Sequence, residues 1–134
     1  MKNSSKKVIF TLGLLFTISI GFSQDDALFK NVRSALKIGS SRELAKYFNE
    51  TIELNINGES ASYSSIHAEI YLKDFFKKYK PVDFEFAHYG GSSSEKQKFA
   101  IGNYSFSGGS FRVLIRAKAF NGTYKIYIVD FLKE

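Results

Sequence analysis

Four stretches in the second half of the chain decide its fold class: VDFEFAHY at residues 82–89, KFAIGNYSFS at 98–107, FRVLIRAKAF at 111–120 and TYKIYIVDFL at 123–132. Apolar and polar side chains alternate along much of each stretch, which is typical of strands with one buried face. The breaks between the stretches all contain glycine, and they lie at residues 90–95, 108–109 and 121–122. Short breaks of this kind join neighbouring antiparallel strands. The sequence therefore predicts a four-stranded antiparallel meander.

Two short helices are expected before the meander. Apolar residues recur at i, i+3, i+4 and i+7 from Leu28 onwards and stop at Gly39, a residue type that often ends a helix. Ser40 and Glu43 have the spacing of a capping box, in which a hydroxyl and a carboxylate satisfy the first backbone N–H groups. A second short helix is therefore predicted to begin there.

A hairpin and a longer helix are predicted in the middle of the chain. Residues 52–56 alternate between apolar and polar and lead into Asn57-Gly58, a strong signal for a tight turn between two strands. Residues 66–79 place their apolar side chains on one side of a helical wheel, and Pro81 follows. The predicted fold class is α+β, with an antiparallel sheet packed on helices.

Residues 1–23 have the pattern of a cleavable secretory signal peptide. Three lysines precede an apolar run at residues 8–22, and the small residues Gly21 and Ser23 come shortly before Gln24. The run is shorter than the roughly 20 residues that a membrane-spanning helix needs. We therefore expect an exported protein, either periplasmic or secreted, that is cleaved after Ser23.

The composition excludes several classes of protein. The chain has no cysteine, so it can form no disulfide and is not expected to be a lipoprotein. Its formal net charge is +6, and without the three lysines of the leader the charge is an ordinary +3, which argues against a nucleic-acid partner. Residues 24–134 are expected to form one domain, with no membrane partner once the leader is removed.

Several stretches of sequence resemble a family of small exported proteins known only as a domain of unknown function. They are ELAKYF at residues 43–48, LKDFF at 72–76, FEFAHYG at 84–90, FAIG at 99–102 and GSFRV at 109–113. The order of the predicted elements resembles the nuclear-transport-factor-2-like superfamily, which has a cystatin-like fold. The resemblance implies a bent sheet that forms a cone around one long helix. Because this superfamily contains both enzymes and noncatalytic domains, the resemblance does not fix a function.

His88 is the candidate for catalysis. It shares strand parity with Phe84 and Phe86, so we expect it on the face of the sheet that meets the helices. There it could act as a general base or form structural hydrogen bonds in the core. The carboxylate of Asp130 is expected at the other end of the sheet, so no acid–base pair is predicted. With two histidines and no cysteine, neither a metal site nor a cofactor is expected.

A ligand pocket inside the cone is expected to be bordered by His88, Tyr71, Tyr104 and Tyr124. Small residues on the second and third strands of the meander would leave space there for a small apolar or amphipathic molecule. The alternative is that aromatic rings of the long helix fill this space.

The opposite face of the sheet is expected to mediate dimerisation. The residues predicted there are Leu114, Tyr127, Val129 and Phe131. This set is more apolar than a sheet face in water should be, and a homodimer would cover it. The sequence thus favours a noncatalytic exported domain that binds a small ligand or a protein partner. The alternative is an enzyme that uses His88 for proton transfer.

Overall fold

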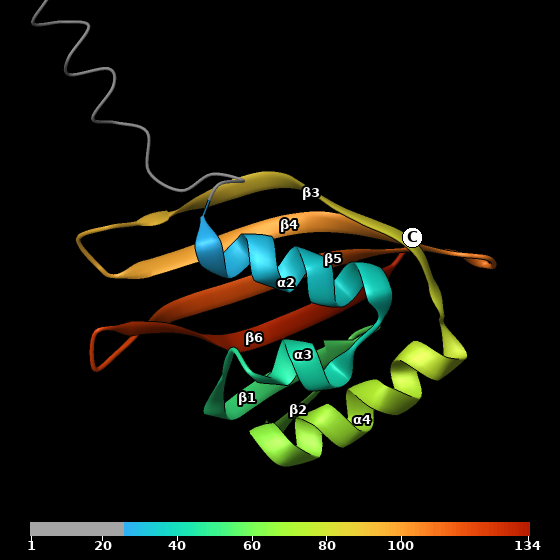
Figure 1. Ribbon diagram of the computed structural model, residues 1–134, viewed down its shortest axis with the longest axis horizontal. Coiled ribbons are helices and arrows are strands. Elements are labelled where there is room, and N and C mark those ends of the chain that lie inside the picture. The colour runs from blue at the N-terminus through green and yellow to red at the C-terminus, as the bar shows by residue number, and fades with distance from the viewer. Residues whose placement is uncertain (1–25) are drawn as a thin grey trace, which may run out of the picture.

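The structure is a computed structural model that describes residues 26–134, so the leader predicted at residues 1–23 lies outside the described residues. The described chain forms three helices and six strands (Figure 1). The helices are α2 (Ala27–Ile38), α3 (Ser41–Ala45) and α4 (Ser65–Lys78). The strands are β1 (Phe48–Ile56), β2 (Glu59–Ser64), β3 (Pro81–Ser92), β4 (Gln97–Phe106), β5 (Gly109–Phe120) and β6 (Thr123–Lys133).

A polar side chain caps the first turn of each helix. The carboxylate of Asp26 accepts hydrogen bonds from the first backbone N–H groups of α2. Ser40 accepts a hydrogen bond of 3.1 Å from the N–H of Glu43, and Ser64 begins α4 in the same way. Gly39 ends α2 in the left-handed conformation, with φ at 70°. The predicted end of α2 at Gly39 and the predicted cap of α3 by Ser40 are thus confirmed, while the carboxylate of Glu43 pairs with Lys46 instead of completing the capping box.

The strands form one sheet with the order β2-β1-β6-β5-β4-β3. All neighbours are antiparallel except β1 and β6, which run in parallel. The turns at Asn57-Gly58 and Asn121-Gly122 have positive φ at both residues, which Asn-Gly sequences favour in hairpins. These two turns are therefore where the sequence predicts them.

The predicted architecture needs correction in two respects. The last four strands pair in sequence order, but they are not a separate meander, because the β1–β2 hairpin extends the same sheet through β6. The helix α4 has 14 residues and α2 has 12, so no single long helix organises the fold. The parallel pairing of β1 and β6 joins segments about 70 residues apart, and no local pattern indicates it.

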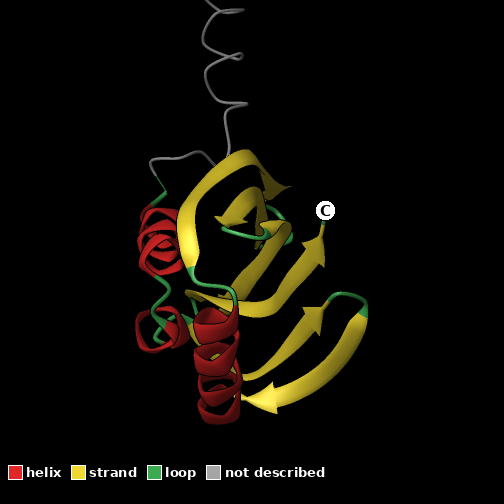
Figure 2. Ribbon diagram, turned by 90° about the vertical axis from the view of Figure 1, so that its right-hand side faces the viewer, coloured by secondary structure: helices red, strands yellow, loops and turns green. Residues whose placement is uncertain are grey.

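All three helices lie on one face of the sheet, as Figure 2 shows. The helix α2 packs against β3 and β4, while α4 packs against β1 and β2. The opposite face has no helix on it within residues 26–134, and we call it the outer face. This two-layer arrangement buries the apolar side chains of both layers in one core.

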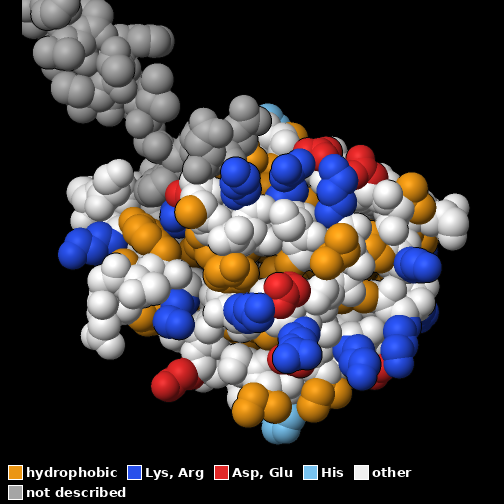
Figure 3. All heavy atoms as spheres, in the orientation of Figure 1, with side chains coloured by type: hydrophobic (Ala, Val, Ile, Leu, Met, Phe, Trp, Pro, Cys, Tyr) orange, Lys and Arg blue, Asp and Glu red, His pale blue; other side chains and the backbone are white. Residues whose placement is uncertain are grey.

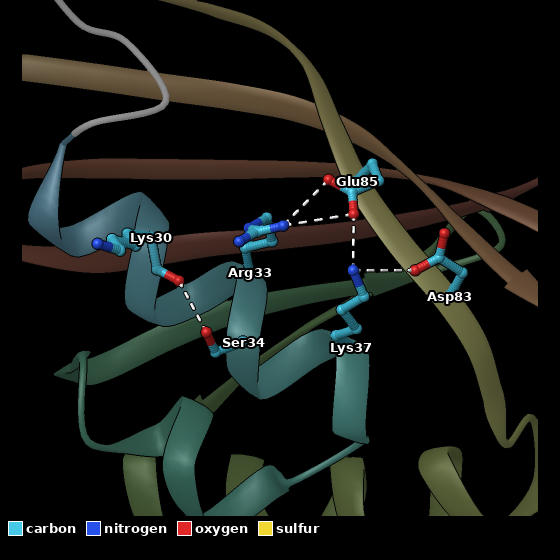
Figure 4. A network of polar contacts seen from close by, with 6 residues as sticks. All are labelled: Lys30, Arg33, Ser34, Lys37, Asp83 and Glu85. Atoms are coloured by element: carbon cyan, nitrogen blue, oxygen red, sulfur yellow. Dashed lines mark hydrogen bonds and ion pairs between the residues drawn. The ribbon is translucent and has the colours of Figure 1, made fainter.

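Ion pairs tie α2 to the edge strand β3 (Figure 4). The Nζ atom of Lys37 lies 2.8 Å from Oε2 of Glu85 and 3.4 Å from Oδ1 of Asp83. Arg33 also contacts Glu85, at 3.2 Å. The hydrogen bond from Lys37 lowers the pKa of the Glu85 carboxyl and raises the pKa of Lys37. Because these groups are exposed, the pairs position α2 more than they stabilise the fold.

Candidate functional site: the outer face of the sheet

A β-bulge in β3 places His88 on the outer face. Phe86 pairs with Gly102 and His88 pairs with Ile101, so Ala87 is an extra residue without a partner. A bulge of this kind inverts the alternation of side chains beyond it. His88 is consequently exposed on the outer face, and its predicted helix-facing position is wrong. No sequence signal marks this bulge.

His88 is not paired with Asp130. The strand register aligns it in one crosswise row with Ile101, Leu114 and Asp130. The two titratable groups are therefore at the same level of the sheet, not at its opposite ends as expected. Three strand spacings still separate them, which is about 14 Å. An acid–base pair of His88 with Asp130 is excluded by this distance.

The four predicted pocket residues do not come together. Tyr104 is completely buried, and its hydroxyl donates a hydrogen bond to the backbone carbonyl of Tyr79. Burial raises the pKa of Tyr104 well above its usual range. Tyr71 is 41% exposed and packs on Tyr63, with 5.5 Å between their rings. The ring of Tyr124 lies beside the ammonium group of Lys98, and His88 is on the outer face of the sheet.

Aromatic rings of α4 fill the space in which the pocket was expected. The ring of Phe75 lies 4.4 Å from that of Phe131 and 6.0 Å from that of Tyr104. Phe76 stacks on Tyr104, with 6.1 Å between the ring centres. The helix-facing side of the sheet is therefore a packed core at this point, and the alternative considered from the sequence is correct.

Lys98 is a buried charge that sequence reasoning missed. It is 7% exposed, and its Nζ atom lies 2.6 Å from the carboxylate of Asp26, which also caps α2. The same ammonium group lies 4.2 Å from the ring centre of Tyr124 and 5.4 Å from that of Phe29. These contacts compensate the charge and anchor the start of α2 to β4, so its role is structural.

The predicted dimer residues divide between the two faces. Leu114 and Tyr127 lie half-buried on the outer face, whereas Val129 and Phe131 are completely buried in the core. The prediction is wrong for the latter two because β6 also contains a bulge, at Tyr127. Beyond it, Ile128 takes the outward position that simple alternation gives to Val129.

The outer face combines an apolar strip with basic side chains. The strip consists of the half-buried residues Phe99, Ile101, Leu114, Tyr127 and Ile128. The strand β5 adds the cations Arg112, Arg116 and Lys118. Two hollows of about 230 and 350 Å³ open beside the strip.

The cations of β5 lie close to the aromatic members of the strip. The guanidinium of Arg116 lies 5.6 Å from the ring centre of Phe99, and Lys118 lies 4.5 Å from that of Tyr127. Arg112 pairs with Glu134 at 3.2 Å, whereas no ion pair links Arg116 to another residue of the described chain. A surface of this kind is suited to contact with another molecule.

The neighbouring strands carry acidic side chains on the same face. Asp130 on β6 and Glu53 on β1 lie close together, and neither forms an ion pair with another residue among 26–134. Burial raises the pKa of Asp130, and repulsion from Glu53 adds to this effect, while a hydrogen bond from Asn55 opposes it. The Oδ1 atom of Asn55 is buried without a hydrogen-bond partner. Opposite charges therefore occupy adjacent parts of the outer face.

Residues 26–134 contain no group of three His, Asp or Glu side chains close enough to hold a metal ion. Within the same residues, no helix is both long and apolar enough to cross a bilayer.

Comparisons with known proteins agree with this fold. Residues 29–131 match the family model of a domain of unknown function, DUF4783. A DUF4783 family protein from Bacteroides ovatus is 31% identical with a TM-score of 0.74, over 78% of this chain and 93% of that chain. A DUF4783 family protein from Bacteroides fragilis is 30% identical with a TM-score of 0.72, over 78% and 96% of the two chains.

A more distant structure extends the comparison to the fold alone. An NTF2-like protein of unknown function from Cytophaga hutchinsonii is 13% identical with a TM-score of 0.58, over 87% of this chain and 94% of that chain. No curated protein matches the chain significantly. The resemblance drawn from the sequence is confirmed, and the chain belongs to the DUF4783 family, a family of unknown function with an NTF2-like fold.

Proposed function

We propose that the protein is an exported, noncatalytic domain that binds a protein partner through its outer face, and that the partner is a second copy of the chain. The observation that carries this proposal is the placement of opposite charges on adjacent strands beside the apolar strip. The leader at residues 1–23 supports export. Because aromatic rings fill the cone, the geometry favours a protein partner over a small ligand held inside it.

The outer face is complementary to itself. Consider two copies whose outer faces meet, related by a two-fold axis that runs parallel to the strands above the boundary between β5 and β6. This axis places β5 of each copy over β6 of the other. Arg116 of one copy then comes within reach of Asp130 of the second copy, and the same contact forms twice. The apolar strips cover each other at the centre. An enzyme based on His88 receives no comparable support, because this residue lies outside the core and three strand spacings from Asp130.

Charge-swap variants test this arrangement. We expect Arg116→Asp and Asp130→Arg each to be monomeric alone, because each places like charges opposite each other twice. A mixture of the two variants should form a heterodimer, since each of the two contacts again joins opposite charges. Sedimentation velocity of each variant and of the mixture measures the result.

Lys30→Asp is the matched control for Arg116→Asp, because it makes the same change of charge at an exposed position of α2. It should dimerise like the unmutated protein. The proposal fails if the unmutated protein is monomeric at every concentration tested, or if the mixed variants do not associate.

The dimer should weaken on acidification. In the single subunit, burial and Glu53 raise the pKa of Asp130, and contact with an arginine of the second copy would lower it again. Between these two pKa values association releases a proton, so affinity is fully present above the pKa of the free subunit and is lost as the pH falls from there through the lower pKa of the dimer. Dissociation constants measured between neutral and acidic pH test this, and Asp130→Asn should remove most of the dependence. An unchanged affinity across this range would contradict the pairing.

A further inference from the structure

The solvent-exposed side of α4 is unusually apolar at its beginning. Ile66 is 71% exposed and Ile70 is 57% exposed. Close to the other end of the same helix, Ile38 is 71% exposed and lines a hollow together with Lys73 and Lys77. Of the six large apolar side chains that are strongly exposed among residues 26–134, Ile66, Ile70 and Tyr71 lie on α4 and Ile38 lies beside its end. Isolated exposed apolar residues are ordinary, but such a concentration indicates a contact surface.

Lysines continue this surface along the helix. Lys73 and Lys77 follow Ile66 and Ile70 at the i, i+4, i+7 and i+11 positions, so all four project from one stripe of α4. Figure 3 shows apolar side chains at the lower edge of the molecule, over the start of α4, and basic ones along the rest of it. We call this stripe, together with Lys80 and Ile38, the α4 ridge.

The cations of the α4 ridge surround a shallow hollow. It has a volume of about 420 Å³, and its lining includes Lys73, Lys77 and Lys80 beside the apolar surfaces of Ile38 and Phe76. None of the three lysines forms an ion pair with another residue of the described chain.

Acidic side chains border the ridge without neutralising it. Asp74 is exposed and Glu69 is half-buried on α4 itself, while Asp83 on β3 is paired with Lys37. The ridge therefore keeps an excess of positive charge beside its apolar side chains.

We propose that the α4 ridge binds the surface of a membrane that contains anionic phospholipids. Isoleucine tips that project from a helix can enter the boundary between headgroups and acyl chains, while neighbouring lysines contact the phosphates. Both views of the chain place α4 at one end of the molecule, where a flat surface can approach it (Figures 1 and 2). This is a contact at the bilayer surface and no span, and it revises the expectation that the domain has no membrane partner.

Vesicle binding tests the proposal with the protein lacking residues 1–23, whose described core lies entirely within residues 26–134. Co-sedimentation should show binding to vesicles of equimolar phosphatidylglycerol and phosphatidylcholine, and little binding to pure phosphatidylcholine. The double variant Lys73→Gln/Lys77→Gln should weaken binding about thirty-fold, since two lysines near an anionic surface are removed. Ile66→Ser/Ile70→Ser should also weaken it, although the net charge is unchanged.

Lys30→Gln/Lys125→Gln is the matched control, because it removes the same charge away from the α4 ridge. It should retain most of the binding, and circular dichroism should show that every variant is folded. Equal binding to both vesicle types, or equal losses in the control and in the Lys73/Lys77 variant, would overturn the proposal. So would binding to an acidic polypeptide such as polyglutamate in the absence of vesicle binding, which would assign the ridge to a protein partner. Monomeric charge-swap variants of the outer face should bind vesicles normally, so the two proposals can fail separately.

Discussion

The hydroxyl of Tyr104 satisfies a backbone carbonyl at the end of α4, inside a cluster of aromatic rings. Tyr104→Phe removes the donor and leaves the carbonyl of Tyr79 without its partner, while the packing of the ring is kept. We expect a loss of about 1–2 kcal/mol in the free energy of unfolding. Chemical denaturation, followed by circular dichroism, measures this loss.

His88→Ala is the useful comparison for that measurement. If His88 lay in the core, as strand parity predicts, its removal should lower the free energy of unfolding as much as the removal of another buried hydrogen-bonding group. Because His88 is exposed on the outer face, we instead expect the free energy of unfolding to change by no more than about 0.5 kcal/mol. A large loss for His88→Ala, or no loss for Tyr104→Phe, would contradict these placements.

The bulge in β6 makes opposite predictions for two adjacent residues. Val129 is completely buried, so Val129→Asp places a carboxylate in the core and should cost more than about 4 kcal/mol or prevent folding. Ile128 is half-buried on the outer face, and Ile128→Asp should keep the fold while it disturbs the proposed dimer. Thermal unfolding and sedimentation together distinguish the two effects. If the Val129→Asp variant were a folded monomer, the side chain of Val129 would have to lie on the outer face and not in the core.

Turns and helix ends could be predicted from the sequence because their causes are local. Gly39, Ser40 and the two Asn-Gly pairs act through the conformations and hydrogen bonds of a few neighbouring residues. The bulges at Ala87 and Tyr127 have no such local cause, since they follow from how adjacent strands fit together. One extra residue in a strand reverses every side chain beyond it. This is why His88, Val129 and Phe131 were assigned to the wrong faces while Leu114 was not.

The outer face as a whole could be predicted only in part. Its apolar character and its row of cations on β5 follow from alternation in a strand whose register is regular up to Arg116. The acidic part could not be predicted, because Glu53 meets Asp130 only through the parallel pairing of β1 with β6. Whether the cone contains a pocket depends on how far the aromatic rings of α4 reach toward the sheet. The periodicity of the sequence does not determine this reach.

The position of β6 has a consequence for how the chain reaches its folded state. This strand is last in the described chain, yet it lies inside the sheet between β1 and β5. Until β6 joins the sheet, the edge of β1 that faces away from β2 has no strand to pair with. Because β1 and β6 are far apart in the sequence, their pairing is expected to be a slow step of folding.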